Sequence, residues 1–258
     1  MNDFVLKIIG SPIGKVSIFS AGQAGYIVKS KSGQLLGIDL YLSECVERVE
    51  GHIGFKRLLP KILSPYDLEF DCIIATHTHY DHFDMDSIPQ LMSNNKTKLF
   101  ASVNCEEEVQ RLKMLNDNVA YVKPGDVIEC GDFGLSFVAC DHGASAPDAV
   151  GVIISVDGKK IFEVGDSCLR LDLIDEFSKY GPFDVLIAPI NGAYGNLNER
   201  ECAILANALE PKLTIPSHYG MFASHGGNPG LFHKIMTDEY PHNPYLIMSM
   251  GEKLTLDN

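Results

Sequence analysis

The stretch THTHYDHFD, residues 76–84, follows directly on the apolar run DCIIA at residues 71–75. It places four ligand-type side chains within six residues: His77, His79, Asp81 and His82. If the strand formed by the apolar run stays extended through its end, His77 and His79 project from the same side and can share one ion. Asp81 and His82 follow where the chain bends and can hold a second ion. The stretch therefore predicts a metal site, and an exposed polar loop with satisfied histidines is the alternative.

Three further ligand-type residues each follow a predicted apolar strand. His142 comes after LSFVAC, Asp166 after KKIFEVG and His218 after KLTIPS. Side chains at the ends of different strands can converge at one edge of a sheet. Each residue alone has an ordinary interpretation, since an Asp after Gly often caps a helix and a lone His usually lies at the surface. Together with the first stretch, the three residues extend the predicted metal site.

The order of the predicted elements indicates the fold class. Strands are predicted at residues 16–21, 25–30, 34–39, 71–76, 98–102, 119–122, 127–130, 135–140, 149–156, 159–165, 183–190, 212–217, 245–250 and 253–256. Helices are predicted at residues 87–94, 105–115, 169–180, 198–209 and 229–239, with a short one after residue 42. This order suits an α/β fold in which two sheets pack face to face with helices outside, a four-layer sandwich. We expect residues 1–258 to form a single domain.

Composition narrows the class of protein. With 258 residues, 45% of them hydrophobic, the chain is expected to be soluble and globular. No apolar run approaches the roughly 20 residues of a membrane span, and the first residues lack the features of a signal peptide. Seven cysteines without a C-x-x-C pair predict reduced thiols and a cytoplasmic protein.

Charge narrows the class of partner. The formal net charge is −13 and the sequence contains no Lys/Arg cluster, which argues against nucleic acid as a partner. A small anion could still bind beside a metal centre, because the ions dominate the local field. The number of subunits is not fixed by the sequence, and a homo-oligomer is left open.

Two glycine-containing loops are candidates for substrate binding. The first, PINGAYGN at residues 189–196, carries Asn191 and Tyr194; the second, SHGGN at residues 224–228, carries His225 and Asn228. Backbone N–H groups in such turns can hold a phosphate or carboxylate. The alternative is that both segments are simply tight turns.

The ligand pattern resembles the metallo-β-lactamase superfamily. THTHYDH, His142, the Gly-Asp pair at 165–166 and His218 carry this resemblance, which covers nearly the whole chain. The segments at 22–27, 38–43, 123–126, 165–167 and 216–222 further resemble the L-ascorbate-6-phosphate lactonase-like hydrolases. The resemblance implies two mixed β-sheets with helices on the outer faces.

The resemblance also implies a ligand set of seven residues. It assigns a first ion to His77, His79 and His142, a second ion to Asp81, His82 and His218, and a bridging role to Asp166. Because relatives can carry an Asp near position 142, the sequence leaves open whether Asp141 or His142 is the ligand.

The function expected from this site is metal-dependent hydrolysis. Two divalent ions supply a hydroxide at neutral pH and polarise the substrate, while Asp81 handles the proton passed to the leaving group. Ligands that are all His and Asp admit Zn²⁺ or Mn²⁺, with Fe²⁺ also possible. We expect a lactone or ester of a small anionic substrate, such as a phosphorylated sugar acid. The alternatives are a phosphodiesterase of the same superfamily and a metal-retaining binding protein without turnover.

Overall fold

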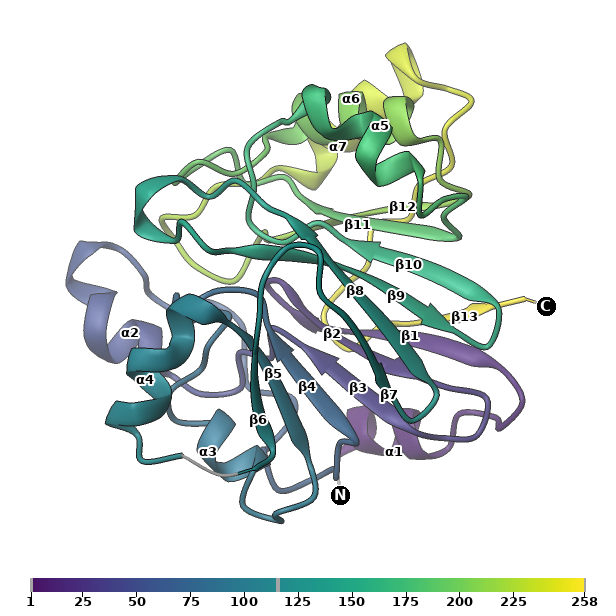
Figure 1. The fold of residues 1–258 in the computed structure, drawn as a ribbon. Helices are drawn as coiled ribbons and strands as arrows, with labels where there is room; N and C mark the ends of the chain where they lie inside the picture. Colours follow the sequence, from purple (N-terminus) through teal and green to yellow (C-terminus); the bar gives the residue numbers. More distant parts are fainter. Residues whose placement is uncertain (1, 115–116, 258) are drawn as a thin grey trace.

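The computed structural model describes residues 2–114 and 117–257, and it contains two β-sheets packed face to face (Figure 1). The first sheet has the order β13-β1-β2-β3-β4-β5-β6, and the second has the order β12-β11-β10-β9-β8-β7. The strands of the first are β1 (Val16–Gly22), β2 (Gly25–Lys29), β3 (Leu35–Ile38), β4 (Cys72–Ala75), β5 (Lys98–Ser102), β6 (Val119–Val122) and β13 (Lys253–Leu256). The strands of the second are β7 (Val127–Cys130), β8 (Phe133–Ala139), β9 (Val150–Val156), β10 (Lys159–Glu163), β11 (Val185–Pro189) and β12 (Thr214–Ser217).

Both sheets are mixed. In the first sheet, β13, β1, β2 and β3 pair antiparallel, whereas β3, β4, β5 and β6 pair parallel. In the second, β7, β8, β9 and β10 pair antiparallel, whereas β10, β11 and β12 pair parallel. The parallel strands of both sheets send their carboxyl ends to a common edge, where loops can meet.

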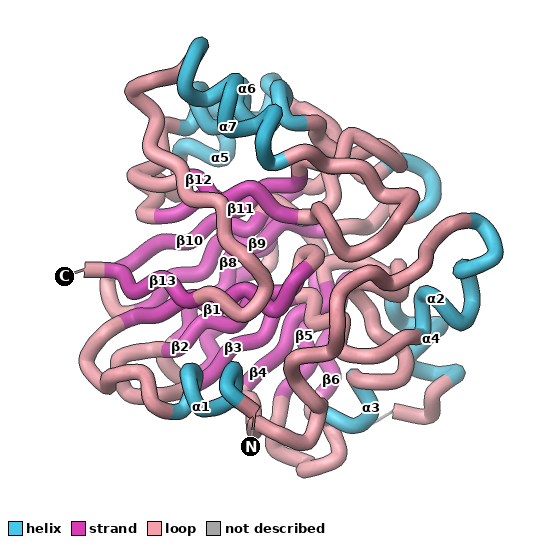
Figure 2. The backbone as a smooth tube through the Cα atoms, turned by 180° about the vertical axis from the view of Figure 1, so that it is seen from behind, coloured by secondary structure: helices cyan, strands magenta, loops and turns pink. Residues whose placement is uncertain are grey.

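Helices cover the outer face of each sheet. On the first sheet these are α1 (Asp3–Ile9), α2 (Cys45–Glu50), α3 (Ile88–Leu91) and α4 (Glu106–Arg111); on the second they are α5 (Ile174–Ser178), α6 (Glu199–Leu209) and α7 (Pro229–Glu239) (Figures 1 and 2). The expected four-layer α/β sandwich of two mixed sheets is confirmed. None of the helices among the described residues has the length and apolar character needed to cross a bilayer.

The alternation of side chains along each strand explains why one face of a sheet packs on the other sheet and the opposite face packs on helices. In β4, Cys72 and Ile74 face the core between the sheets, while Ile73 and Ala75 face the helices. Because successive side chains point to opposite faces, a strand covered on both sides reads as a continuous apolar run. The run before the THTHYDHFD stretch is therefore an internal strand, as the sequence predicts.

Four predicted elements differ from the structure. The helix expected at 87–94 is confined to the four residues of α3. The strand expected at 245–250 forms only an isolated bridge between Thr214 and Tyr245; Met248 is buried in the core without joining a ladder. The helix expected at 105–115 is confined to α4, and Leu115 lies outside the described residues. The segment 169–180 begins with a 3-10 turn, Leu171–Leu173, before α5. In contrast, α6 begins as predicted, because Asn198 and Glu201 form a capping box.

Candidate metal centre

The THTHYDHFD stretch forms a turn instead of an extended strand end. Strand β4 ends at Ala75, and the backbone N–H groups of His82 and Phe83 both donate to the carbonyl oxygen of His79, at 2.9 and 2.7 Å. The condition of an extended strand end is therefore not met, because residues 76–79 form a bend. The two rings still meet as expected, with His77 Nε2 2.9 Å from His79 Nδ1.

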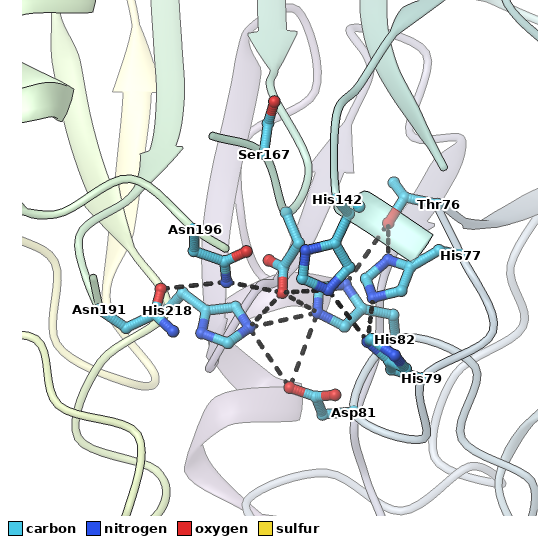
Figure 3. Close-up of polar contacts among 12 residues, drawn as sticks. Thr76, His77, His79, Asp81, His82, His142, Ser167, Asn191, Asn196 and His218 are labelled. Atoms are coloured by element: carbon cyan, nitrogen blue, oxygen red, sulfur yellow. Dashed lines mark hydrogen bonds and ion pairs between the residues drawn. The ribbon is translucent and has the colours of Figure 1, made fainter. Parts of the chain in front are cut away.

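Three strand ends bring the distant residues to the same place. His142 follows β8, Asp166 follows β10 and His218 follows β12 directly. His142 Nε2 lies 3.1 Å from His79 Nδ1. His218 Nε2 lies 3.1 Å from Asp166 Oδ2 and 3.2 Å from His82 Nε2. Figure 3 shows these rings pointing toward one another from both sheets. The structure thus gathers all seven residues that the sequence singled out.

The gathered side chains form three overlapping sets of potential ligands. Within each set, one donor atom per residue lies within 4.8 Å of the others. The sets are His77, His79 and His142; His77, His82 and Asp166; and Asp81, His82 and His218. The two outer sets are the residues expected to hold the first and the second ion, and Asp166 Oδ2 lies 3.8 Å from His142 Nε2 and 3.1 Å from His218 Nε2.

The contacts of Asp141 and His142 differ. Asp141 Oδ2 accepts a hydrogen bond of 2.9 Å from Arg170 Nη1. His142 is buried and directs Nε2 at His79. The structure therefore favours His142 as the residue available to a metal ion.

Hydrogen bonds from neighbouring residues fix how two of the rings are oriented. Asp39 Oδ2 accepts from Thr76 Oγ1 at 2.7 Å, so the same hydroxyl oxygen can accept from His77 Nδ1, which is 3.2 Å away. His82 Nδ1 lies 2.7 Å from Asp39 Oδ2 and can donate to it. Donation from Nδ1 directs Nε2 of both rings at the cluster, and an ion bound there would take the place of any proton on Nε2, as in metal-binding histidines.

Burial keeps one group of rings neutral. It lowers the pKa of His77 well below its usual range, lowers the pKa of His79, and brings the pKa of His142 to about 4, although the negative charge of Asp166 partly opposes this. Neutral imidazoles with facing lone pairs are poor hydrogen-bond partners for each other. They are well suited to share a cation, so the donor set fits a metal ion.

A second group of side chains is charged. Burial alone would lower the pKa values of His82 and His218, but the negative charges of Asp166 and the other nearby carboxylates outweigh it. The pKa of His82 is therefore well above its usual range, and the pKa of His218 is raised to about 9. Burial would raise the pKa values of Asp81 and Asp166, but His82 and His218 hold both well below their usual range. The buried carboxylates of Asp81 and Asp166 thus favour positive charge within the cluster. A divalent ion would supply that charge in place of the imidazole protons.

Three supporting residues received no role in the sequence analysis. Gln23 Nε2 donates to Asp81 Oδ2 at 2.9 Å, and Asn196 Nδ2 donates to Asp166 Oδ2 at 2.8 Å. Asp39, described above, is the third. A signal existed for Asp39, since it ends a predicted apolar strand in the same way as the strand-end residues that were identified. For Gln23 and Asn196 the signal was only their place in short polar turns.

A cavity of about 270 Å³ opens over the cluster. His79, Asp81, His142 and Asp166 form its floor, and Tyr194 and His225 stand in its wall. Two of the four residues predicted to bind substrate therefore line this cavity.

The other two predicted residues do not line the cavity. Asn191 is buried, and its Oδ1 accepts from Asn196 Nδ2 at 3.1 Å. Asn228 Oδ1 accepts from the backbone of Leu231, so the side chain caps α7. The expectation that Asn228 contacts substrate does not agree with this position.

The glycines of the 224–228 loop are explained by packing. Gly226 and Gly227 both have positive φ, and a Cβ at Gly227 would lie 2.7 Å from Cβ of Tyr219. A Cβ at Gly226 would lie 2.8 Å from the carbonyl oxygen of Asn191. Only glycine fits where two loops approach so closely. Tight packing therefore accounts for this sequence without an anion.

The fold and the ligand cluster together define a metallohydrolase-type centre at the edge of two packed sheets. The family described as Beta-lactamase superfamily domain matches residues 44–219. This range covers most of the chain and includes every residue of the cluster. The protein therefore belongs to that family, and the expected superfamily is confirmed.

Known proteins support the assignment. A relative from Saccharolobus solfataricus, named a UPF0173 metal-dependent hydrolase, is 29% identical over 75% of this chain and 86% of its own length. The structure of Igni18, described as a novel metallo hydrolase from Ignicoccus hospitalis, has a TM-score of 0.73 at 20% identity, covering 95% of this chain and 99% of that one. A metallo-beta-lactamase fold protein from Bacillus subtilis has a TM-score of 0.70 at 16% identity, covering 94% and 99%. The two structures show that the fold is shared.

Proposed function

We propose that this protein is a metal-dependent hydrolase that opens a lactone or cleaves a carboxylic ester of a small molecule, using two divalent ions. The observation that carries the proposal is the convergence of seven His and Asp side chains in overlapping sets beneath an open cavity. The name of the Saccharolobus relative, a metal-dependent hydrolase, agrees with it.

The chemistry divides between the ions and the chain. Divalent ions held by the two outer sets would lower the pKa of a water molecule and polarise a carbonyl oxygen. Asp81 lines the cavity floor, where its carboxylate can orient the attacking water, accept its proton and pass it to the leaving alkoxide. Gln23 holds the carboxylate in place by donating to Oδ2. Asp81 is thus both a candidate ligand and the candidate catalytic residue.

The donor atoms restrict the metal. The donor atoms of the three sets are imidazole nitrogen and carboxylate oxygen, and no cysteine belongs to the sets. Zn²⁺ and Mn²⁺ suit these donors, as does Fe²⁺. Metal analysis of the purified protein by mass spectrometry identifies the ion and its stoichiometry, which we expect to be two per chain.

Other features support a cytoplasmic enzyme with a small-molecule substrate. The seven cysteines are all free thiols, which fits a reducing compartment. The net charge of −13 opposes a nucleic-acid partner.

Activity on three compounds tests the reaction class. The metal-loaded protein is assayed with a homoserine lactone, a sugar lactone phosphate and bis-p-nitrophenyl phosphate. We expect hydrolysis of a lactone. Cleavage of the phosphodiester alone would replace the proposal with a phosphodiesterase, and bound metal without any turnover would indicate a binding protein.

A variant of Asp81 tests the assigned role. Asp81→Asn removes the proton acceptor but keeps the size of the side chain, and we expect a rate at least about 100-fold lower. Metal content is measured in the same samples, which separates loss of ions from loss of proton transfer. The control is Asp238→Asn, because Asp238 only pairs with Lys234 on the exposed face of α7. A near-wild-type rate in a metal-loaded Asp81→Asn protein would remove this role.

A further inference from the structure

The cavity over the metal centre has an aromatic wall. Phe55, Tyr194 and His225 form it, with ring centroids 5.5 Å apart for Phe55 and Tyr194, 5.1 Å for Phe55 and His225, and 5.3 Å for Tyr194 and His225. All three residues line the cavity, and Ile53 extends the apolar surface at its rim. A substrate whose reacting bond lies at the floor must place its remaining atoms against this wall.

Tyr194 is held over the cavity at a conformational cost. Its side chain is 54% exposed, and its φ is 56°, in the left-handed region that a bulky aromatic residue rarely adopts. Backbone strain of this kind persists mainly where binding or catalysis uses it. The ring packs against Phe55 and His225 on one side and leaves the rest of its surface open to the cavity, where a ligand can contact it.

The cavity provides no positive side chain. Its lining contains one further carboxylate, Glu50, and neither a lysine nor an arginine among the described residues. Two nearby basic residues are held elsewhere: Lys56 pairs with Glu47, and Arg170 pairs with Asp141. The phosphorylated sugar acid expected from the sequence would therefore find only the metal ions for its charge and would meet Glu50 at the wall.

We propose that the site takes a neutral lactone or ester whose planar apolar substituent packs against Phe55 and Tyr194, and that Glu50 disfavours anionic analogues. This inference rests on the proposed hydrolase function, since it names the substrate class of the same site. Phe55 and Tyr194 are binding residues in this view. Glu50 acts on selectivity alone and touches no reacting atom.

Three lactones with the same reacting ring test the inference. They are γ-butyrolactone, its γ-phenyl derivative, and the γ-(4-carboxyphenyl) derivative, which adds one negative charge to the phenyl compound. We expect kcat/KM to be about 10-fold higher for the phenyl compound than for either of the others, as expected for an apolar group in an apolar pocket. Equal or faster hydrolysis of the carboxyphenyl compound would overturn the inference.

Two variants assign the effects to residues. Tyr194→Asn keeps the left-handed backbone, which Asn tolerates, and should lower kcat/KM about 10-fold for the phenyl compound and clearly less for γ-butyrolactone, which has no substituent to pack against the ring. Glu50→Gln should raise the rate on the carboxyphenyl compound several-fold and leave the phenyl compound unchanged. Tyr66→Asn is the matched control, because Tyr66 is 72% exposed and lies outside the cavity. An equal loss on all three lactones in Tyr194→Asn would overturn the role of the ring.

A binding measurement separates this inference from the reaction class. The corresponding phenyl and carboxyphenyl γ-lactams resist hydrolysis, and their affinities for the metal-loaded protein are measured by calorimetry. Tighter binding of the neutral lactam than of the carboxylate, together with weaker binding of the neutral lactam to Tyr194→Asn, would support the substrate class. If none of the lactones is opened, that failure counts against the hydrolase proposal and leaves the binding result intact. Equal affinities, or tighter binding of the carboxylate, would overturn the inference.

Discussion

Asp39 Oδ2 lies 2.7 Å from Nδ1 of His82, and both side chains are completely shielded from solvent. The same carboxylate accepts from the backbone N–H and the hydroxyl of Thr76, at 2.8 and 2.7 Å. Asp39 therefore connects the end of β3 to the turn that carries the metal-ligand candidates. Its position orients the His82 ring directly and the His77 ring through Thr76.

Asp39→Asn should weaken metal binding. The amide retains one acceptor oxygen, so the three hydrogen bonds to the carboxylate cannot all be kept. Loss of such a supporting contact typically lowers metal affinity about 10- to 100-fold. Competition with a chromophoric chelator measures the affinity, and Asp132→Asn, at a surface carboxylate that accepts from Ser30, is the control. Unchanged affinity in Asp39→Asn would show that His82 is oriented without it.

Removal of the metal should destabilise the protein. Without ions, the charges of the buried Asp81 and Asp166 carboxylates are balanced by the imidazolium groups of His82 and His218, while Gln23 and Asn196 donate one amide hydrogen bond each. A ligand present at 100 times its Kd stabilises the folded state by about 2.7 kcal/mol, so EDTA should lower Tm by several degrees. EDTA should lower the Tm of His142→Ala by less than it lowers the Tm of the wild type. The control is His233→Ala, on the exposed side of α7, in which EDTA should lower Tm as much as in the wild type. If the protein loses its ions in EDTA and its Tm does not change, the seven side chains do not hold a stabilising metal ion.

The sequence identified the cluster because its signals were local. The spacing of His77, His79, Asp81 and His82 is visible in one short stretch, and His142, Asp166 and His218 each follow an apolar strand. Strands that run in the same direction, such as β8, β10 and β12, bring such ends to one edge of a sheet whatever the details of the turns.

The substrate cavity could not be predicted in the same way. Phe55 comes from the loop after α2 and Tyr194 from the loop after β11, and no periodicity links the two. Asn228 shows the same limit, since its place in a glycine-rich loop predicts a binding residue, while in the structure its side chain caps α7. Which loop residues face a cavity depends on tertiary contacts that sequence patterns do not encode.

Glu163→Gln should stabilise the protein increasingly as the pH rises. Glu163 belongs to β10, is 1% exposed, and its Oε2 has no hydrogen-bond partner among the described residues. Burial, with a further contribution from the negative charge of Asp39, raises the pKa of Glu163 well above its usual range. Below the unfolded-state pKa of about 4.3, both states hold the proton and the residue has no effect on stability.

Above that pH, the unfolded chain releases the proton and the folded protein retains it. The free energy of unfolding of the wild type should then fall relative to the Gln variant by up to about 1.4 kcal/mol per pH unit, until the pH reaches the folded-state pKa. Urea unfolding of both proteins at pH 5 and pH 8 measures the difference, and comparing the two proteins cancels the pH dependence of metal binding. A difference that is the same at both pH values would show that Glu163 is ionised in the folded protein.

Asp84→Ala should cost more stability than any other single carboxylate outside the metal centre. Asp84 is fully buried and accepts from the backbone of Leu42, Ser43, Asp86 and Ser87 and from the Ser43 hydroxyl, at 2.7 to 3.0 Å. Alanine would leave these buried donors unpaired, each at a cost of about 1–3 kcal/mol before relaxation. We expect a loss of about 4 kcal/mol, and a smaller loss for Asp84→Asn.

The neighbouring Asp86 provides the control for this prediction. Its side chain pairs with Arg48 at the surface, so Asp86→Ala should cost less than about 1 kcal/mol. Because Asp84 joins the segment after β3 to the turn carrying the ligand candidates, its loss should also weaken metal binding, and the chelator assay should detect this. A stable Asp84→Ala protein with unchanged metal affinity would mean that the turn keeps its shape through the metal and the strands alone.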